Sequence, residues 1–202
     1  MKIGILGAGI VAQTIAKQVL PFGHEVMISN TRGPDSLTPL VKELGLGASA
    51  GTAEQVTDQD IVVLAVGWPA VQSALATIPE WKGRVLVDAT NRFASLNPMR
   101  LGDISGRTSS EIVADLAPGA RVIKAFNSVA MNWIADASKS KPRTVLFISG
   151  DDAEAKKLLH DLIEQVGFCC VDLGTLAIGG RLQQVGGPLA GIRLTFNERL
   201  AL

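Results

Sequence analysis

A glycine-rich turn near the amino end constrains the fold of this chain more than any other feature of its sequence. The turn, residues 7–12 (GAGIVA), has the form GxGxxA and follows directly on a short apolar run at residues 2–6. Apolar residues then recur at helical spacing over residues 10–20, until Pro21 and Gly23 end the pattern. A strand, this turn and a helix, in that order, are typical of a dinucleotide-binding βαβ unit.

Each small residue of the turn has a steric reason. Gly7 allows the tight turn, Gly9 lets the backbone approach a pyrophosphate, and Ala12 lets the helix and the strand pack closely. The free N–H groups at the start of the helix, aided by its dipole, would bind the anion. The alternative is a glycine-rich turn that binds no ligand.

The rest of the chain continues the alternation of strands and helices. Short apolar runs predict strands at 25–29, 60–66, 84–88, 120–126, 143–149 and 168–173. Helical spacing, proline and a capping box predict helices near 36–45, 69–77, 108–116, 130–137 and 152–166, with one more in the tail from 175 to 202. This alternation predicts an α/β fold of the Rossmann type, with a doubly wound, mostly parallel sheet, helices on both faces and a short C-terminal extension.

Length and composition set the organisation. The 202 residues favour one domain over residues 1–202, with a nucleotide-binding core at 1–150 and an extension at 151–202. The loop at 89–107 is the longest stretch without a predicted element, and it is either functional or a variable surface excursion.

Charge and cysteine usage exclude several classes of partner. Lysine plus arginine equals aspartate plus glutamate, 19 each, so no net charge draws the chain to nucleic acid or to an anionic membrane. No apolar run approaches the length of about 18 residues that a spanning helix needs.

The two cysteines, Cys169 and Cys170, are adjacent, which excludes a disulfide framework and fits a reducing, cytoplasmic compartment. We read them as buried small residues of an apolar strand rather than as a redox pair.

The end of the second predicted strand indicates which dinucleotide the chain prefers. NAD-binding domains usually place a carboxylate there for the ribose 2′-hydroxyl. Residues 29–32 are Ser-Asn-Thr-Arg and contain none. The guanidinium of Arg32 suits a 2′-phosphate, and a hydrogen bond to a charged group contributes about 1.5–3 kcal/mol, roughly a tenfold to hundredfold preference for NADP. A solvated arginine in a polar loop is the alternative.

Ligands of doubly wound sheets lie outside the carboxyl ends of the strands. Reading those ends gives Trp68 as a cover for the cofactor, and Asn91 and Asn127 as hydrogen-bonding groups for its ribose or nicotinamide. The alternatives are a tryptophan that caps the core and asparagines that form turns.

Three stretches together resemble the NADP oxidoreductases related to the deazaflavin (coenzyme F420)-dependent NADP reductases, a group that includes the cytosolic domain of membrane-bound ferric reductases. They are MKIGILGAGIVAQTIAKQVLPFGHEVMISNTRG, SSEIVADLAPGARVIKAFNSV and VDLGTLAIGGRLQQVGGPLAG. They are spread over nearly the whole chain. The fingerprint departs from one common form of these reductases, GxTGxxG, because Gly9 stands where threonine is frequent.

The resemblance implies a set of cofactor contacts. It places the pyrophosphate of NADP(H) along the glycine turn and the 2′-phosphate at the loop after the second predicted strand. The nicotinamide end then lies near the carboxyl ends of the strands predicted at 60–66 and 120–126. Together with the residues read from the turn and the strand ends, the expected cofactor-binding residues are Gly7, Ala8, Gly9, Ile10, Val11, Asn30, Thr31, Arg32, Val66, Gly67, Trp68, Asn91, Phe126 and Asn127. It also implies that the segment from Leu176 to Pro188 lines the second-substrate side, from the same chain or from a partner subunit of a homodimer.

The expected activity is hydride transfer between NADP(H) and a small redox acceptor, namely F420, a flavin or a similar conjugated molecule. Such a transfer needs two rings held close together and little else. Two alternatives stay open: an NADPH-binding sensor or scaffold without turnover, and a dehydrogenase of a small oxo or hydroxy acid. A dehydrogenase of this kind needs a general acid or base. The chain has no tyrosine for that role, and Lys124 is the candidate that remains. We assign no catalytic residue, and no metal, because His24 and His160 lie too far apart to form a ligand motif.

Overall fold

A sheet with the predicted doubly wound arrangement organises the computed structural model, which describes residues 1–78, 80–135 and 141–197. In spatial order its strands are β10 (Cys169–Asp172), β9 (Arg143–Gly150), β8 (Arg121–Lys124), β5 (Val85–Asp88), β4 (Ile61–Leu64), β1 (Lys2–Leu6), β2 (Glu25–Ser29) and β3 (Ala48–Ala50), and β11 (Thr195–Phe196) pairs with β9. From β8 to β3 all neighbours are parallel. Strand β9 runs antiparallel to β8, and β10 returns parallel to β9.

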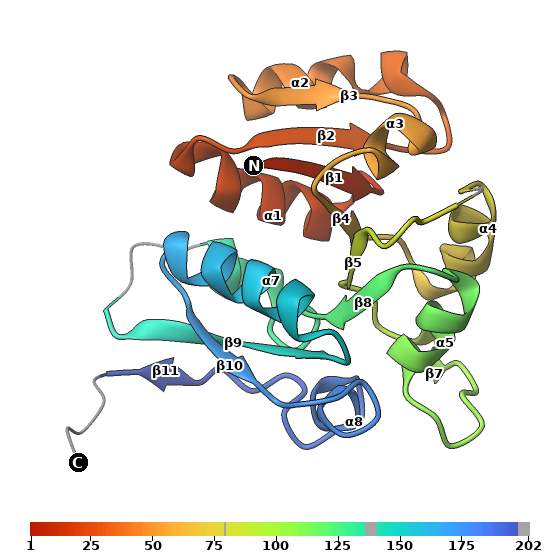
Figure 1. The fold of residues 1–202 in the computed structure, drawn as a ribbon, viewed down its shortest axis with the longest axis vertical. Helices are drawn as coiled ribbons and strands as arrows, with labels where there is room; N and C mark the ends of the chain where they lie inside the picture. The colour runs from red at the N-terminus through yellow and green to blue at the C-terminus, as the bar shows by residue number, and fades with distance from the viewer. Residues whose placement is uncertain (79, 136–140, 198–202) are drawn as a thin grey trace.

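Both faces of this sheet carry a hydrophobic core. Along β4, Ile61 and Val63 belong to one core whereas Val62 and Leu64 belong to the other, because successive side chains of a strand point to opposite faces. The first face is covered by α1 (Ile10–Val19), α2 (Thr38–Leu44), α6 (Met131–Ala135) and α7 (Ala153–Gln165), and the second by α3 (Ala53–Thr57), α4 (Val71–Ala76) and α5 (Ser109–Leu116). The Rossmann-type α/β fold predicted from the sequence is therefore confirmed (Figure 1).

The helix starts follow the local sequence. At α5 the Thr108 hydroxyl accepts a hydrogen bond from the Glu111 amide at 3.2 Å, and the Glu111 carboxylate accepts one from the Thr108 amide at 2.7 Å. This is the capping box that the sequence predicted. Short 3₁₀ turns complete the loops: η1 (Leu20–Phe22), η2 (Pro34–Leu37) and η3 (Trp68–Ala70).

The structure corrects the sequence-based expectations in a few places. The stretch 89–107 is not structureless, because it holds a hairpin of β6 (Phe93–Leu96) and β7 (Met99–Leu101) with an irregular register. Strand β3 and helix α3 were not foreseen. Of the predicted tail, the part up to residue 197 is described and holds one short helix, α8 (Gly179–Gln183), which packs against β9. Residues 136 and 137 of the predicted helix at 130–137 lie outside the described residues.

Candidate functional site

A cleft of about 570 Å³ opens at the carboxyl ends of β1, β2 and β4. This is the end of the sheet at which doubly wound proteins bind ligands, and the volume is within the usual range for small-molecule sites. Seven of the expected cofactor residues line it: Gly7, Ala8, Gly9, Asn30, Thr31, Val66 and Gly67. The structure therefore brings together three segments that are far apart in the sequence.

The glycine turn forms the floor of the cleft with the geometry that the fingerprint predicts. Gly7 has φ +115°, and a Cβ atom there would lie 2.3 Å from the Ala65 carbonyl oxygen, so only glycine fits. A Cβ atom on Gly9 would meet no atom within 4 Å. Helix α1 begins just beyond with no side-chain cap, and Ala12 is fully buried against the sheet. The open space at Gly9 and the uncapped helix start together fit a bound pyrophosphate.

The opposite wall of the cleft consists of small side chains that the sequence analysis missed. They are Ala53 at the start of α3, and Ala70, Ser73, Ala74 and Thr77 along η3 and α4. The last four recur at helical spacing, and this stripe of small residues is the signal that would have found them. Because small side chains leave room for a flat ring, this wall suits the adenosine half of a dinucleotide.

The loop after β2 is held in shape by two polar side chains. The Asn30 carboxamide oxygen accepts a hydrogen bond from the Arg32 amide at 2.9 Å, and its nitrogen donates to the Ser36 hydroxyl at 3.0 Å. Ser36 in turn donates to the Gly33 carbonyl at 2.7 Å. Arg32 itself is exposed, directly after the cleft residue Thr31. Asn30 thus organises the loop, and Arg32 is left available at its rim.

Four more expected residues, Trp68, Asn91, Phe126 and Asn127, form a second group at the ends of β4, β5 and β8. The Asn91 side chain donates to the Asn127 carbonyl at 2.9 Å, and the Asn127 side chain donates to the Gln183 carbonyl at 2.8 Å. The segment expected on the second-substrate side therefore does reach Asn127. Phe126 is buried with φ +59°, a strained backbone conformation of the kind that often marks functional sites.

Trp68 lies half-buried in η3 beside the β6–β7 hairpin. A Cβ atom on Gly102, which follows β7, would lie 2.5 Å from the Trp68 indole nitrogen, so the ring packs directly on the glycine backbone. Ile10 and Val11 lie at the start of α1, exposed and half-buried respectively, next to the cleft residue Gly9.

Lys124 is buried completely and is unsuited to proton transfer with a substrate. Its ammonium group donates to the Asp88 carboxylate at 3.0 Å and to the Thr90 carbonyl at 2.6 Å. The second Asp88 oxygen accepts from the Thr90 amide and hydroxyl, and Ser110 also donates to this carboxylate. With its donors used inside the protein, Lys124 gives no support to the oxo-acid dehydrogenase hypothesis.

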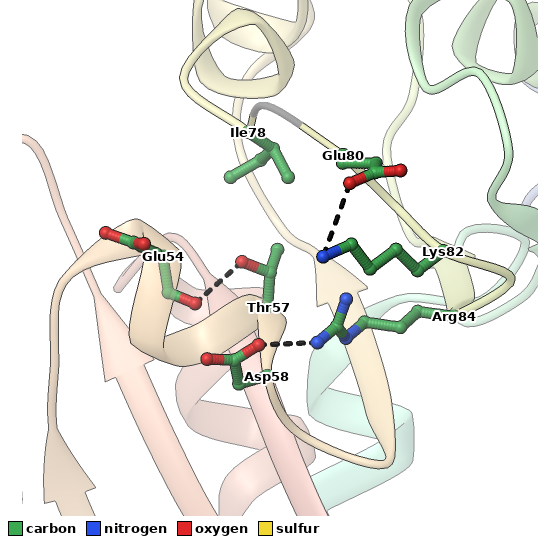
Figure 2. A pocket seen from close by; sticks show the side chains of 7 residues that line it. All are labelled: Glu54, Thr57, Asp58, Ile78, Glu80, Lys82 and Arg84. Carbon is green, nitrogen blue, oxygen red and sulfur yellow. Dashed lines mark hydrogen bonds and ion pairs between the residues drawn. The ribbon is translucent and has the colours of Figure 1, made fainter.

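A second hollow lies at the opposite end of the sheet, before β4 and β5 (Figure 2). It measures about 240 Å³. Both of its cations already pair with carboxylates, Arg84 with Asp58 and Lys82 with Glu80. Since this is the amino end of the strands and its cations have partners, we do not regard it as the functional site.

The cysteines and histidines do not add chemistry to the site. Burial raises the pKa of the Cys170 thiol to about 12, so it stays protonated and unreactive at neutral pH. Within the described ranges, no group of three histidine, cysteine, aspartate or glutamate side chains is placed to hold a metal ion. Among the helices of those ranges, none combines the length and apolar character needed to cross a membrane.

Comparisons with known proteins point to a family of oxidoreductases. The model of the family "NADP oxidoreductase coenzyme F420-dependent" matches residues 2–92, which include the glycine turn, the Arg32 loop and Asn91. The crystal structure of hypothetical protein SMa0349 from Sinorhizobium meliloti is 34% identical, with a TM-score of 0.90, over 98% of this chain and 97% of that one.

Two curated proteins extend the comparison. The F420-dependent NADP reductase of Methanocaldococcus jannaschii is 22% identical over 98% of this chain and 95% of its own length. The metalloreductase STEAP3 of Rattus norvegicus is 27% identical over 91% of this chain, which spans only 36% of the metalloreductase.

Proposed function

Because the chain belongs to the family of NADP oxidoreductases related to the coenzyme F420-dependent enzymes, we propose that it is an NADPH-dependent reductase of a deazaflavin, a flavin or a similar small acceptor. The cleft at the carboxyl ends of β1, β2 and β4 carries this proposal. It combines an open glycine turn, a wall of small side chains and an arginine-bearing loop in the arrangement that a phosphorylated dinucleotide needs.

Each part of the cleft has a role in holding the cofactor. The backbone from Gly7 to Val11 binds the pyrophosphate, the α4 wall accepts the adenine, and Arg32 with Thr31 takes the 2′-phosphate. Asn91 and Asn127, at the ends of β5 and β8, orient the nicotinamide half. When bound, NADPH supplies a hydride for the acceptor.

The protein's own contribution is positioning. Asn91 and Asn127 carry amides, which do not titrate, so they suit orientation rather than proton transfer. Hydride transfer to a conjugated ring requires little beyond two faces held at contact distance. The acceptor side is formed by Trp68, the β6–β7 hairpin and the segment around Gln183.

Turnover with a panel of acceptors tests the proposal. The purified protein is mixed anaerobically with NADPH and, in turn, oxidised F420, FMN and riboflavin, and the absorbance of the reduced nicotinamide is followed. We expect it to fall with at least one acceptor, with one equivalent of NADPH consumed per acceptor reduced. If NADPH binds and no acceptor is reduced, the protein is not a reductase of this class, and a cofactor-binding sensor takes its place.

A further inference from the structure

Arg92, in the short link between β5 and β6, carries a positive charge with no carboxylate partner among the described residues. Its Nη1 donates to the Gly102 carbonyl at 2.7 Å, and the Gly102 amide donates back to the Arg92 carbonyl at 2.7 Å. Its Nε is buried and has no hydrogen-bond acceptor in the described part of the chain. No carboxylate of that part lies within ion-pair distance of it.

The surroundings of Arg92 place it on the acceptor side of the site. It follows Asn91, which is bonded to Asn127, and it holds Gly102, on which Trp68 packs. A Cβ atom on Gly186 would lie 3.8 Å from Arg92 Nη2, so the arginine lies beside the segment after α8. The strand ends, the hairpin and the C-terminal segment therefore meet at this one guanidinium.

Buried polar groups are normally satisfied, and an arginine fork matches the geometry of a phosphate or carboxylate. Lys124, which is fully buried, has its carboxylate from Asp88, whereas half-buried Arg92 has none among the described residues. The contrast indicates that the counter-charge of Arg92 comes from outside the chain.

We propose that Arg92 binds an anionic group, a phosphate or carboxylate, of the hydride acceptor, so that the acceptors of this protein are anionic rather than neutral. This inference rests on the proposed reductase function and adds to it the charge class of the second substrate. The pyrophosphate and 2′-phosphate of the cofactor have their own sites at the glycine turn and the Arg32 loop, so they do not account for Arg92.

FMN and riboflavin test the proposal, because they share one ring system and differ by a single phosphate. Binding of each flavin to the NADP⁺-saturated protein is measured by quenching of flavin fluorescence. We expect FMN to bind about tenfold more tightly or better than riboflavin, from one charge-assisted contact. Arg92→Gln should remove that preference by weakening FMN alone, since its amide can still donate to the Gly102 carbonyl.

Arg100→Gln is the matched control, because Arg100 is an exposed cation on β7 of the same hairpin. This variant should keep the FMN preference within about twofold at an ionic strength where exposed charges are screened. NADPH affinity should be unchanged in both variants.

The outcomes separate this inference from the reductase proposal. An Arg92-dependent preference for FMN without any NADPH oxidation supports the anion site and contradicts the reductase. The inference is overturned if wild-type protein binds FMN no better than riboflavin, or binds neither flavin. It is equally overturned if Arg92→Gln keeps the preference, or if this variant loses NADPH affinity by the same factor as FMN affinity.

Discussion

The Lys124 ammonium lies 3.0 Å from the Asp88 carboxylate, and neither side chain has any exposed surface. Asp88 ends β5 and Lys124 ends β8, two neighbouring parallel strands. Gln183, from α8, donates to the Lys124 carbonyl at 3.1 Å and to the Ser149 hydroxyl at 2.8 Å. The buried pair thus joins the two strands whose ends carry Asn91 and Asn127, and Gln183 links them to the C-terminal segment.

Removing one partner of this pair should destabilise the protein strongly. Lys124→Met leaves the Asp88 carboxylate buried without its cation, which typically costs about 3–5 kcal/mol. Urea unfolding of Lys124→Met and of the double variant Asp88→Asn with Lys124→Met measures the effect. The double variant should recover part of the loss, and a single variant as stable as wild type would show that the pair contributes little.

Steric constraint at the first glycine predicts a second outcome. Gly7→Ala adds a methyl group where the backbone has φ +115° and the Ala65 oxygen is only 2.3 Å away, so we expect a loss of about 2 kcal/mol or more. Gly9→Ala adds the same group into open space and should leave the melting temperature within about 2 °C of wild type. Similar melting temperatures for the two variants would contradict the turn geometry.

Substituting a carboxylate at Gly9 should separate folding from binding. Aspartate is a favourable N-cap, so Gly9→Asp should keep or slightly raise the melting temperature. The same carboxylate would occupy the amides that the pyrophosphate needs and repel its charge. Losing two charge-assisted hydrogen bonds of about 1.5 kcal/mol each predicts at least about a hundredfold weaker NADPH binding. Calorimetric titration measures the affinity of the variant for NADPH. An unaltered affinity would contradict the assignment of the pyrophosphate to this turn.

The main strands were predictable because buried strands consist of branched apolar residues, which the sequence shows directly. Residues 61–64 (IVVL) are fully buried, and a continuous run of branched apolar residues is typical of a parallel strand covered on both faces. Strand β3 was missed because Ala48–Ala50 is short and only partly buried, so its residues show neither a branched run nor an alternation. The β6–β7 hairpin was missed because its strands are short, irregular in register and largely exposed.

Half of the candidate site was predictable for a related reason. The glycine turn and the Arg32 loop are local features, so adjacent residues reveal them. The Asp88–Lys124 pair and the contacts of Asn127 and Arg92 with the C-terminal segment join positions 36 to about 90 residues apart. Only the three-dimensional fold brings these residues together, and no local pattern in a single sequence predicts such distant contacts.

The capping box of α5 predicts a pH effect on stability. The Thr108 amide, by donating to the Glu111 carboxylate, lowers the pKa of that carboxyl below its usual 4.5. Because the folded pKa lies below the unfolded one, Glu111 stabilises the protein above about pH 4.5, and this contribution is lost as pH falls through the lowered folded value. Melting temperatures from pH 7 to pH 3 should fall less steeply for Glu111→Gln than for wild type. Parallel curves would contradict this.

The loop after β2 predicts how the protein chooses between the two nicotinamide cofactors. Arg32→Gln removes the cation expected at the 2′-phosphate and should weaken NADPH binding about tenfold or more, while NADH binding stays unchanged. Ser36→Ala removes the hydroxyl that links Asn30 to the Gly33 carbonyl, so the loop that presents Arg32 loses its fixed shape. We expect Ser36→Ala to reduce the NADPH preference several-fold.

Thr38→Val is the matched control for Ser36→Ala, since the Thr38 hydroxyl donates only to the Asp35 carbonyl at the start of α2. It should leave the ratio of NADPH to NADH affinity unchanged. Wild type and each variant are titrated with both cofactors by quenching of tryptophan fluorescence. This gives the ratio of NADPH to NADH affinity for each protein. A ratio near one in the wild-type protein would contradict the assignment of the 2′-phosphate to this loop, and an equal loss for NADPH and NADH in Ser36→Ala would show that Ser36 supports the cleft as a whole.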